Sequence, residues 1–425
     1  MPEMSLRSKI ERRKELIESF VSLYVLNGLN LLLPLIALPY LLRVVGPANY
    51  GVYSYIYVII QYVLLIGSYG FDYSATKQIS QQRNNTTEIN RIFNAVIFSK
   101  LLLSFVGLII FFAFSPLYIK SSENYLILFY GVGIVIGDVF IPVWLFQGLE
   151  KMRYLTIVNV ISKLFFTILI FVLINEEEDY KYILLLNSFG YLLAGFFSMF
   201  IVFKSLRLRL KLPHKVDVIS QLKDGLAVFA TTLGMNFYRN SNVFILGFFV
   251  NDSMIGVYAA AEKIIKALQS IMSPIAQALF PHFGFKFSNL DVKESVMALF
   301  RVVKPYSILL SAITMITYFF SPNIITFFGG PEFQDSIVVV KIMSIIILFG
   351  GLNYLLGIVG LINLNEQTAF FKTVILSGLV SVFVLIIFAA KYGIFAAAWS
   401  MVISEVLLFV LLVGKLLSLK HKKHN

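Results

Sequence analysis

Hydrophobic residues occur along this chain in twelve long runs, and polar or charged residues separate one run from the next. Each run holds about 20 mainly apolar residues, the length that an α-helix needs to cross a lipid bilayer. A segment that crosses lipid must satisfy its backbone hydrogen bonds internally, so each run is expected to be a helix. The pattern predicts an all-α polytopic membrane protein whose twelve transmembrane helices lie at about residues 17–43, 50–71, 92–114, 125–147, 154–174, 180–203, 222–250, 254–279, 297–320, 336–362, 367–389 and 393–416.

Positive charge is distributed unequally between the two sides of these spans. An even number of spans places both termini on one side, and about 25 of the 35 lysines and arginines lie on that side. Cytoplasmic loops carry the excess of Lys and Arg in membrane proteins, so both termini are predicted to be cytoplasmic. The other side carries only four, namely Arg43, Lys120, Lys181 and Lys391.

Composition narrows the range of functions. Of the 425 residues, 58% are hydrophobic and 14% charged, and the net charge of +12 follows mainly from the predicted cytoplasmic loops. There is no cysteine, which excludes thiol catalysis, disulfides and cysteine-based metal sites. The four histidines are not spaced as metal ligands, so neither a metal nor any other cofactor is expected. The outer loops are too short to form the large catalytic domain that a polysaccharide polymerase or ligase would need.

The chain contains an internal duplication. At an offset of 205 residues, the motif Gly51-Val52-Tyr53 of the first half aligns with the same three residue types in the second half, 256–258. Each half has an even number of spans, so the copies point the same way and predict two pseudo-symmetric six-helix bundles around a central cavity. The expected divisions are a cytoplasmic N-terminal segment 1–16, an N-terminal bundle 17–203, a basic cytoplasmic linker 204–221, a C-terminal bundle 222–417 and a basic cytoplasmic tail 418–425.

Six cations fall inside the predicted spans, where each costs about 2.5–3.5 kcal/mol at a helix centre. Two of them, Lys100 and Lys341, lie near span ends, where snorkelling to the interface is an equal alternative to a cavity. Lys163, Arg239 and Lys266 lie deeper and favour a water-filled cavity. The full set is Lys100, Lys163, Arg239, Lys263, Lys266 and Lys341.

Polar residues follow helical spacing around these deep cations. Lys163 lies between Asn159 and Thr167 at steps of four, and Glu262 stands four residues before Lys266, where the two can pair. Hydrogen bonding between helices would also explain the uncharged members of such stripes, but not the excess of positive charge. A cationic cavity suits an anionic ligand such as a pyrophosphate or a carboxylate. Besides Glu262, the carboxylates considered for the membrane interior are Asp138 and, nearer span ends, Asp72 and Glu405.

Four stretches of sequence resemble one family of transporters. They are PYLLRVVGPANYGVYSY (39–55), LIGSYGFDYSATKQISQQR (65–83), PVWLFQGLEKMRY (142–154) and GVYAAAEKIIKALQSIMSPIAQALFP (256–281). In order and spacing they resemble the O-antigen flippases, a family of polysaccharide exporters in the multidrug/oligosaccharidyl-lipid/polysaccharide exporter superfamily. The resemblance implies a twelve-helix, two-bundle fold in the inner membrane of a bacterium. The implied activity is translocation of undecaprenyl-pyrophosphate-linked oligosaccharide, an O-antigen or capsule repeat unit, from the cytoplasmic to the periplasmic leaflet by alternating access.

The resemblance also suggests roles for individual residues. The cationic cavity that would hold the pyrophosphate corresponds to Arg43, Lys163, Arg239, Lys263 and Lys266. The candidate sugar contacts are Tyr53, Tyr57, Gln61, Asn236 and Asn240, although the tyrosines also suit an ordinary interfacial belt. The carboxylates placed to couple transport to H+ or Na+ are Asp72, Asp138 and Glu405, each of which is equally able to be a structural partner of a lysine.

Three other functions are alternatives to a flippase for O-antigen units. A cation-coupled multidrug antiporter of the same superfamily would be expected to offer acidic and apolar surfaces, whereas this interior is basic. A lipid II flippase usually carries extra C-terminal spans. A polymerase or ligase enzyme would need a long outer loop, so no enzymatic activity is expected. The expected partners are the lipid-linked oligosaccharide, membrane lipids and the polysaccharide polymerase and chain-length machinery, and no nucleic acid.

Overall fold

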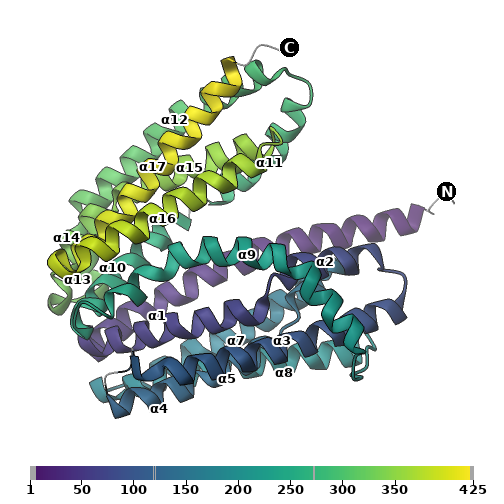
Figure 1. Ribbon diagram of the computed structural model, residues 1–425, viewed down its shortest axis with the longest axis horizontal. Coiled ribbons are helices and arrows are strands. Elements are labelled where there is room, and N and C mark those ends of the chain that lie inside the picture. Colours follow the sequence, from purple (N-terminus) through teal and green to yellow (C-terminus); the bar gives the residue numbers. More distant parts are fainter. Residues whose placement is uncertain (1–5, 118, 120, 271–272, 422–425) are drawn as a thin grey trace. The chain divides into compact units, whose positions relative to one another are not determined.

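The chain folds almost entirely into helices, as the sequence predicts (Figure 1). The structure is a computed structural model that describes residues 6–117, 119, 121–270 and 273–421, and no strand occurs among them. These residues form two compact units, one made of Met1–Val45 with Tyr55–Leu233 and the other of Gly46–Ser54 with Gly234–Asn425. The contiguous domain limits expected from the sequence stay predictions.

The first unit is built around the packing of α5 and α7 against α8. The α5–α8 approach is close because both helices present glycine: a Cβ on Gly137 would lie 2.4 Å from the Tyr191 carbonyl carbon, and one on Gly195 would lie 2.8 Å from the Gly137 oxygen. Small residues let membrane helices bring their backbones together in this way. The helices of this unit are α1 (Leu6–Ser68) apart from Gly46–Ser54, α2 (Phe71–Gln81), α3 (Thr86–Phe114), η1 (Ser115–Leu117), α4 (Ser122–Tyr130), α5 (Val132–Val139), α6 (Val143–Gly148), α7 (Met152–Leu173), η2 (Glu177–Asp179), α8 (Tyr180–Lys204) and the first part of α9 (Lys215–Leu246).

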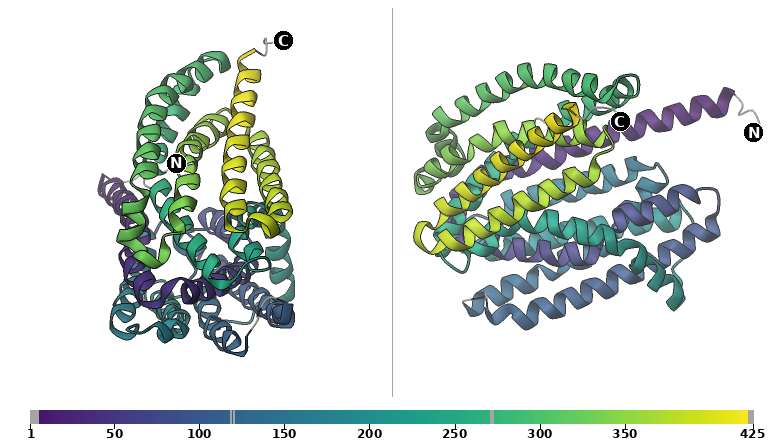
Figure 2. Two further views of the ribbon diagram at one scale, coloured as in Figure 1. Left: turned by 90° about the vertical axis from the view of Figure 1, so that its left-hand side faces the viewer. Right: turned by 45° about the horizontal axis from the view of Figure 1, so that its top comes forward.

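The second unit is centred on α17, against which α12, α15 and α16 pack. Buried serines join α16 and α17: Ser381 Oγ donates to the Ser400 carbonyl and Ser404 Oγ to the Ser377 carbonyl, each at 3.1 Å. In both views of Figure 2 these two helices, drawn in yellow-green and yellow, run alongside each other. The elements after α9 are α10 (Asp252–Ser270), α11 (Ser273–Phe287), α12 (Val292–Phe319), α13 (Ser321–Gly329), η3 (Pro331–Phe333), α14 (Ser336–Met343), α15 (Ile345–Tyr354), the π-helical η4 (Leu355–Ile362), α16 (Gln367–Tyr392) and α17 (Ile394–His421).

Nine helical segments of the described chain are long and apolar enough to cross a bilayer. One of them, Leu33–Gln81, has 49 residues and contains the end of the first predicted span and the whole of the second, because α1 continues through a kink at Gly46. The helices α9 and α10 are not among the nine. They correspond to the seventh and eighth predicted spans. Three of the candidate cavity cations, Arg239, Lys263 and Lys266, lie on these two helices, and so does Glu262. Most of the candidate cations therefore lie on the less apolar spans.

The two copies of the Gly-Val-Tyr motif meet inside the second unit. A Cβ on Gly51 would lie 1.8 Å from the Asp252 carbonyl oxygen, and a Cβ on Gly256 would lie 1.9 Å from the Pro47 carbonyl oxygen. Each added Cβ would also lie 2.9 Å from the backbone nitrogen of the other glycine. Because residues 51 and 256 are equivalent in the duplication and approach each other reciprocally, a local twofold axis passes between them. Only glycine fits at this crossing.

Replacing either glycine with alanine is expected to disrupt the crossing, because the new methyl group meets backbone atoms that cannot rotate away. We expect Gly51→Ala and Gly256→Ala each to destabilise the protein by about 1–3 kcal/mol or more. Thermal unfolding of the detergent-purified protein measures the change. The matched control is Gly414→Ala in α17, where an added Cβ has no atom within 4 Å. A Gly51→Ala protein that unfolds at the same temperature as the control would contradict the predicted clash.

Candidate functional site

Lys100 forms a buried ion pair in the first unit. This lysine of α3 is only 4% exposed, and its Nζ donates to Asp138 Oδ2 at 3.0 Å and to the Asp138 carbonyl at 2.9 Å. Lys100 therefore does not snorkel to the interface, which was one of its two expected alternatives. A buried charge is tolerated when an opposite charge and hydrogen bonds compensate for its lost hydration. In this structure Asp138, a candidate for ion coupling, serves as the counter-ion of Lys100.

Lys266 and Glu262 form the ion pair that their spacing on α10 predicts. Their charged atoms are 3.2 Å apart, with the lysine side chain 39% and the glutamate side chain 11% exposed. Two neighbours extend the polar contacts: Asn242 Nδ2 donates to the Tyr258 hydroxyl at 2.9 Å, and that hydroxyl lies 3.5 Å from Glu262 Oε1. The positive charge of Lys266 is thus largely balanced within the second unit.

Glu405 is held by an amide. Asn353 on α15 is 4% exposed, and its Nδ2 donates to Glu405 Oε2 at 2.6 Å and to the Glu405 carbonyl at 2.9 Å. This contact fixes the carboxylate between α15 and α17. The third carboxylate, Asp72, lies in the first turn of α2, where the helix dipole favours a negative charge. Asp138 and Glu405 therefore have structural partners, and the coupling role of all three carboxylates stays a prediction.

Lys163 differs from these charges because it makes no ion pair with any described residue. It is partly buried, and it lies on the side of α7 opposite the exposed residues Ile157, Ile161 and Ile168, since each residue advances about 100° around a helix. Thr167, one turn further along its own side, is buried. The polar stripe predicted on this span thus faces away from the exposed apolar side of the helix.

The other predicted site residues fall in three groups. Lys263 on α10 is partly buried and makes no ion pair within the described part of the chain, whereas Arg43 is exposed. Tyr53 is buried at 5% and belongs to the second unit, and the half-buried Tyr57 and Gln61 belong to the first. The side chains of Asn236, Arg239 and Asn240 lie outside the described residues.

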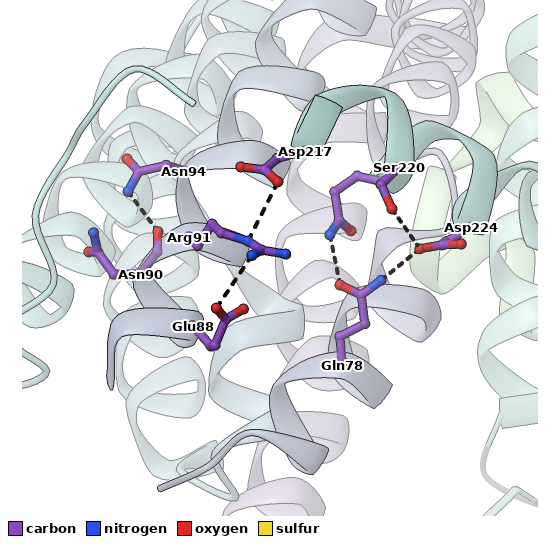
Figure 3. A network of polar contacts seen from close by, with 9 residues as sticks. Gln78, Glu88, Asn90, Arg91, Asn94, Asp217, Ser220 and Asp224 are labelled. Carbon is purple, nitrogen blue, oxygen red and sulfur yellow. Dashed lines mark hydrogen bonds and ion pairs between the residues drawn. The ribbon is translucent and has the colours of Figure 1, made fainter. Parts of the chain in front are cut away.

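A polar cluster at the ends of the predicted spans joins α2 and α3 to the start of α9 (Figure 3). The Arg91 guanidinium lies between two carboxylates, 3.4 Å from Glu88 and 3.5 Å from Asp217. Gln78 donates to Asp224 at 3.0 Å and accepts from Gln221 at 2.7 Å. Sequence reasoning missed this cluster because its members are ordinary loop and helix-end residues with no distinctive spacing. All of them except Asp224 line a cavity of about 210 Å³, together with Gln81, Gln82, Ile92, Ala95 and Ser220.

Removing one member of the Lys100–Asp138 pair is expected to be costly, because the other charge stays buried. Asp138→Asn should destabilise the protein by about 3–5 kcal/mol, whereas the double substitution Lys100→Met with Asp138→Leu should recover most of that loss. Thermal unfolding in detergent measures both. Equal stability of Asp138→Asn and the unmodified protein would show that the pair is not needed to compensate Lys100.

Two comparisons of the amino-acid sequence with known proteins agree with each other. The family described as "Polysaccharide biosynthesis protein" matches residues 16–286. A protein of Escherichia coli K12 named "Putative O-antigen transporter" is 28% identical over 393 residues, which cover 92% of this chain and 94% of that protein.

Solved structures of transporters share the fold. A lipid II flippase MurJ in an inward closed conformation superposes with a TM-score of 0.72 at 11% identity, covering 95% of this chain and 90% of that one. An inward-facing multidrug resistance transporter of the MATE family, in the MOP superfamily, gives a TM-score of 0.70 at 13% identity and covers 92% and 99%. At these identities the likeness concerns the fold alone, and it establishes the twelve-helix, two-lobe architecture expected from the sequence.

Proposed function

The chain belongs to the polysaccharide biosynthesis protein family and is a transporter rather than an enzyme, and we propose that it flips an oligosaccharide linked to undecaprenyl pyrophosphate. The proposed direction is from the cytoplasmic to the periplasmic leaflet of a bacterial inner membrane. The O-antigen transporter name of the Escherichia coli relative supports a lipid-linked saccharide as the substrate class. The excess of lysine and arginine on the side of the termini supports cytoplasmic termini.

The observation that carries the proposal is the contrast between compensated and uncompensated cations. Lys100 and Lys266 have carboxylate partners at 3.0 and 3.2 Å, so their charges are accounted for by the fold. Lys163 and Lys263 have no such partner among the described residues, although both are partly buried in predicted spans. An ionisable residue inside a membrane span that has no counter-ion is expected to serve a function. A ligand that carries phosphate would supply the missing negative charge.

We infer the following mechanism from these charges. The lipid tail stays in the bilayer while the pyrophosphate enters a hydrated cavity and is bound by Lys163 and Lys263, with Arg43, Arg239 and Lys266 as further candidates. Electrostatic attraction in such a cavity is stronger than in bulk water because the effective dielectric constant is lower. The candidate contacts to the sugars are Tyr53, Tyr57, Gln61, Asn236 and Asn240.

Alternating access would then expose the headgroup to the opposite leaflet. Coupling of the return step to H+ or Na+ would fall to Asp72, Asp138 or Glu405. Protonation of Asp138 would have to release its ion pair with Lys100, which gives this residue a means of linking proton binding to helix packing.

Lys163→Ala is expected to abolish export, because the pyrophosphate would lose its uncompensated cation. Lys163→Arg should retain part of the activity, since it keeps the charge. The measurement is surface polysaccharide in a strain that lacks its own flippase, normalised to the amount of tagged protein in the membrane. Arg239→Ala is expected to behave like Lys163→Ala.

The matched control for this experiment is Lys341→Ala. Lys341 also lies in a predicted span, but its Nζ is 5.6 Å from the centre of the Tyr318 ring, so it has a partner within its own unit. If Lys163→Ala exports polysaccharide at the level of the unmodified protein, the assignment of Lys163 to pyrophosphate binding is wrong. If Lys341→Ala loses as much export as Lys163→Ala, the loss reflects a general requirement for embedded cations in folding.

Cysteine labelling tests whether Lys163 faces water, and the native chain is suited to it because it has no cysteine. We expect Lys163→Cys to react with a membrane-impermeant thiol reagent and Ile161→Cys, on the 40% exposed apolar side of the same helix, to remain unlabelled. Mass spectrometry of the labelled protein gives the reacted fraction. No reaction at either position would argue against a hydrated cavity around α7.

A further inference from the structure

The segment between α8 and α9 has no regular secondary structure and is held by two asparagine side chains. Asn90 Oδ1 accepts a hydrogen bond from the Arg209 backbone N–H at 2.7 Å, and Asn94 Oδ1 accepts one from the Lys211 N–H, also at 2.7 Å. Asn94 Nδ2 donates in return to the Arg209 carbonyl at 3.0 Å. Both asparagines lie on α3, as Figure 3 shows, so the segment is fixed along the surface of that helix.

Basic and apolar residues alternate along this segment. Leu208 is buried in the core of the first unit, whereas Leu210 and Leu212 are 55% and 89% exposed. The intervening cations are exposed as well. No carboxylate occurs between residues 204 and 216, and none of the cations of this segment forms an ion pair with a described residue. They are Lys204, Arg207, Arg209, Lys211 and Lys215.

The linker lies directly beside a helix that can cross the bilayer. It begins at Lys204, where α8 ends, and α8 is long and apolar enough to span the membrane. Clusters of four to eight cations directly beside a spanning helix attract anionic lipid headgroups, by about 1 kcal/mol for each cation near the surface. Exposed leucines beside the cations suit the boundary between headgroups and acyl chains.

We propose that this segment, the linker 204–215, is a binding surface for anionic phospholipids, and that Asn90 and Asn94 hold it in the conformation that presents its cations together. The five cations of the linker are spread over twelve residues and all are exposed. Such a row of cations fits several separate headgroups rather than one compact pyrophosphate. The proposal therefore concerns lipids of the bilayer and not the transported substrate, and it does not depend on the proposed function.

The test uses the purified full chain in detergent with phosphatidylglycerol added, and native mass spectrometry counts the bound lipids. The triple variant Arg207→Gln/Arg209→Gln/Lys211→Gln should bind phosphatidylglycerol at least about tenfold more weakly. The matched control, Lys286→Gln/Lys293→Gln/Arg301→Gln, removes three exposed cations predicted to lie on the same side of the membrane and should change the affinity less than twofold. Phosphatidylcholine should bind all three proteins alike.

A second variant separates charge from conformation. The variant Asn90→Ala/Asn94→Ala keeps every cation but removes the hydrogen bonds that hold the linker. We expect its affinity for phosphatidylglycerol to lie between that of the unmodified protein and that of the triple variant. Undiminished lipid binding by the triple variant, or an equal loss in the control, would overturn the binding surface. Undiminished binding by the asparagine variant would overturn the role of the two asparagines. Because no transport is measured, these outcomes are independent of any failure of the proposed flippase activity.

Discussion

A charge inside the hydrocarbon layer of a membrane must be neutralised by the protein, by water or by a ligand. The fold neutralises two of the embedded lysines itself, pairing Lys100 with Asp138 and Lys266 with Glu262. It also holds Glu405 through Asn353. Among the other embedded cations whose side chains the structure describes, Lys341 lies over the Tyr318 ring, and Lys163 and Lys263 remain without an ion pair. The proposed function rests on these two lysines. A count of embedded cations alone would have overstated the positive charge available to a substrate.

The second requirement is close contact between helices, because lipid gives little hydrophobic force to hold them together. Glycines provide it at the crossing of Gly51 with Gly256 and between α5 and α8, and buried serines provide it between α16 and α17. The glycine crossing also explains a sequence observation. The Gly-Val-Tyr repeat appears at equivalent places in the two halves because the two glycines face each other across the local axis, so that neither can gain a side chain.

The linker between α8 and α9 shows how a segment with no regular structure can still be ordered. Its backbone groups would otherwise be exposed, and the side-chain amides of Asn90 and Asn94 take the place of a neighbouring strand. The polar cluster of Arg91 with Glu88 and Asp217 lies beside it and attaches the start of α9 to α3. Together these contacts make the basic region a fixed part of the first unit.

The all-helical membrane fold and the duplication can be predicted from the sequence, because apolar run length and a 205-residue repeat are visible without knowledge of packing. The Lys266–Glu262 pair can also be predicted, since residues four apart on one helix are neighbours. In contrast, the folded structure was needed to show that Lys100 meets Asp138 from another helix, that Gly51 meets Gly256, and that Asn90 and Asn94 hold the linker. Each of these contacts joins residues far apart along the chain, and their pairing depends on how whole helices pack, which no local spacing encodes.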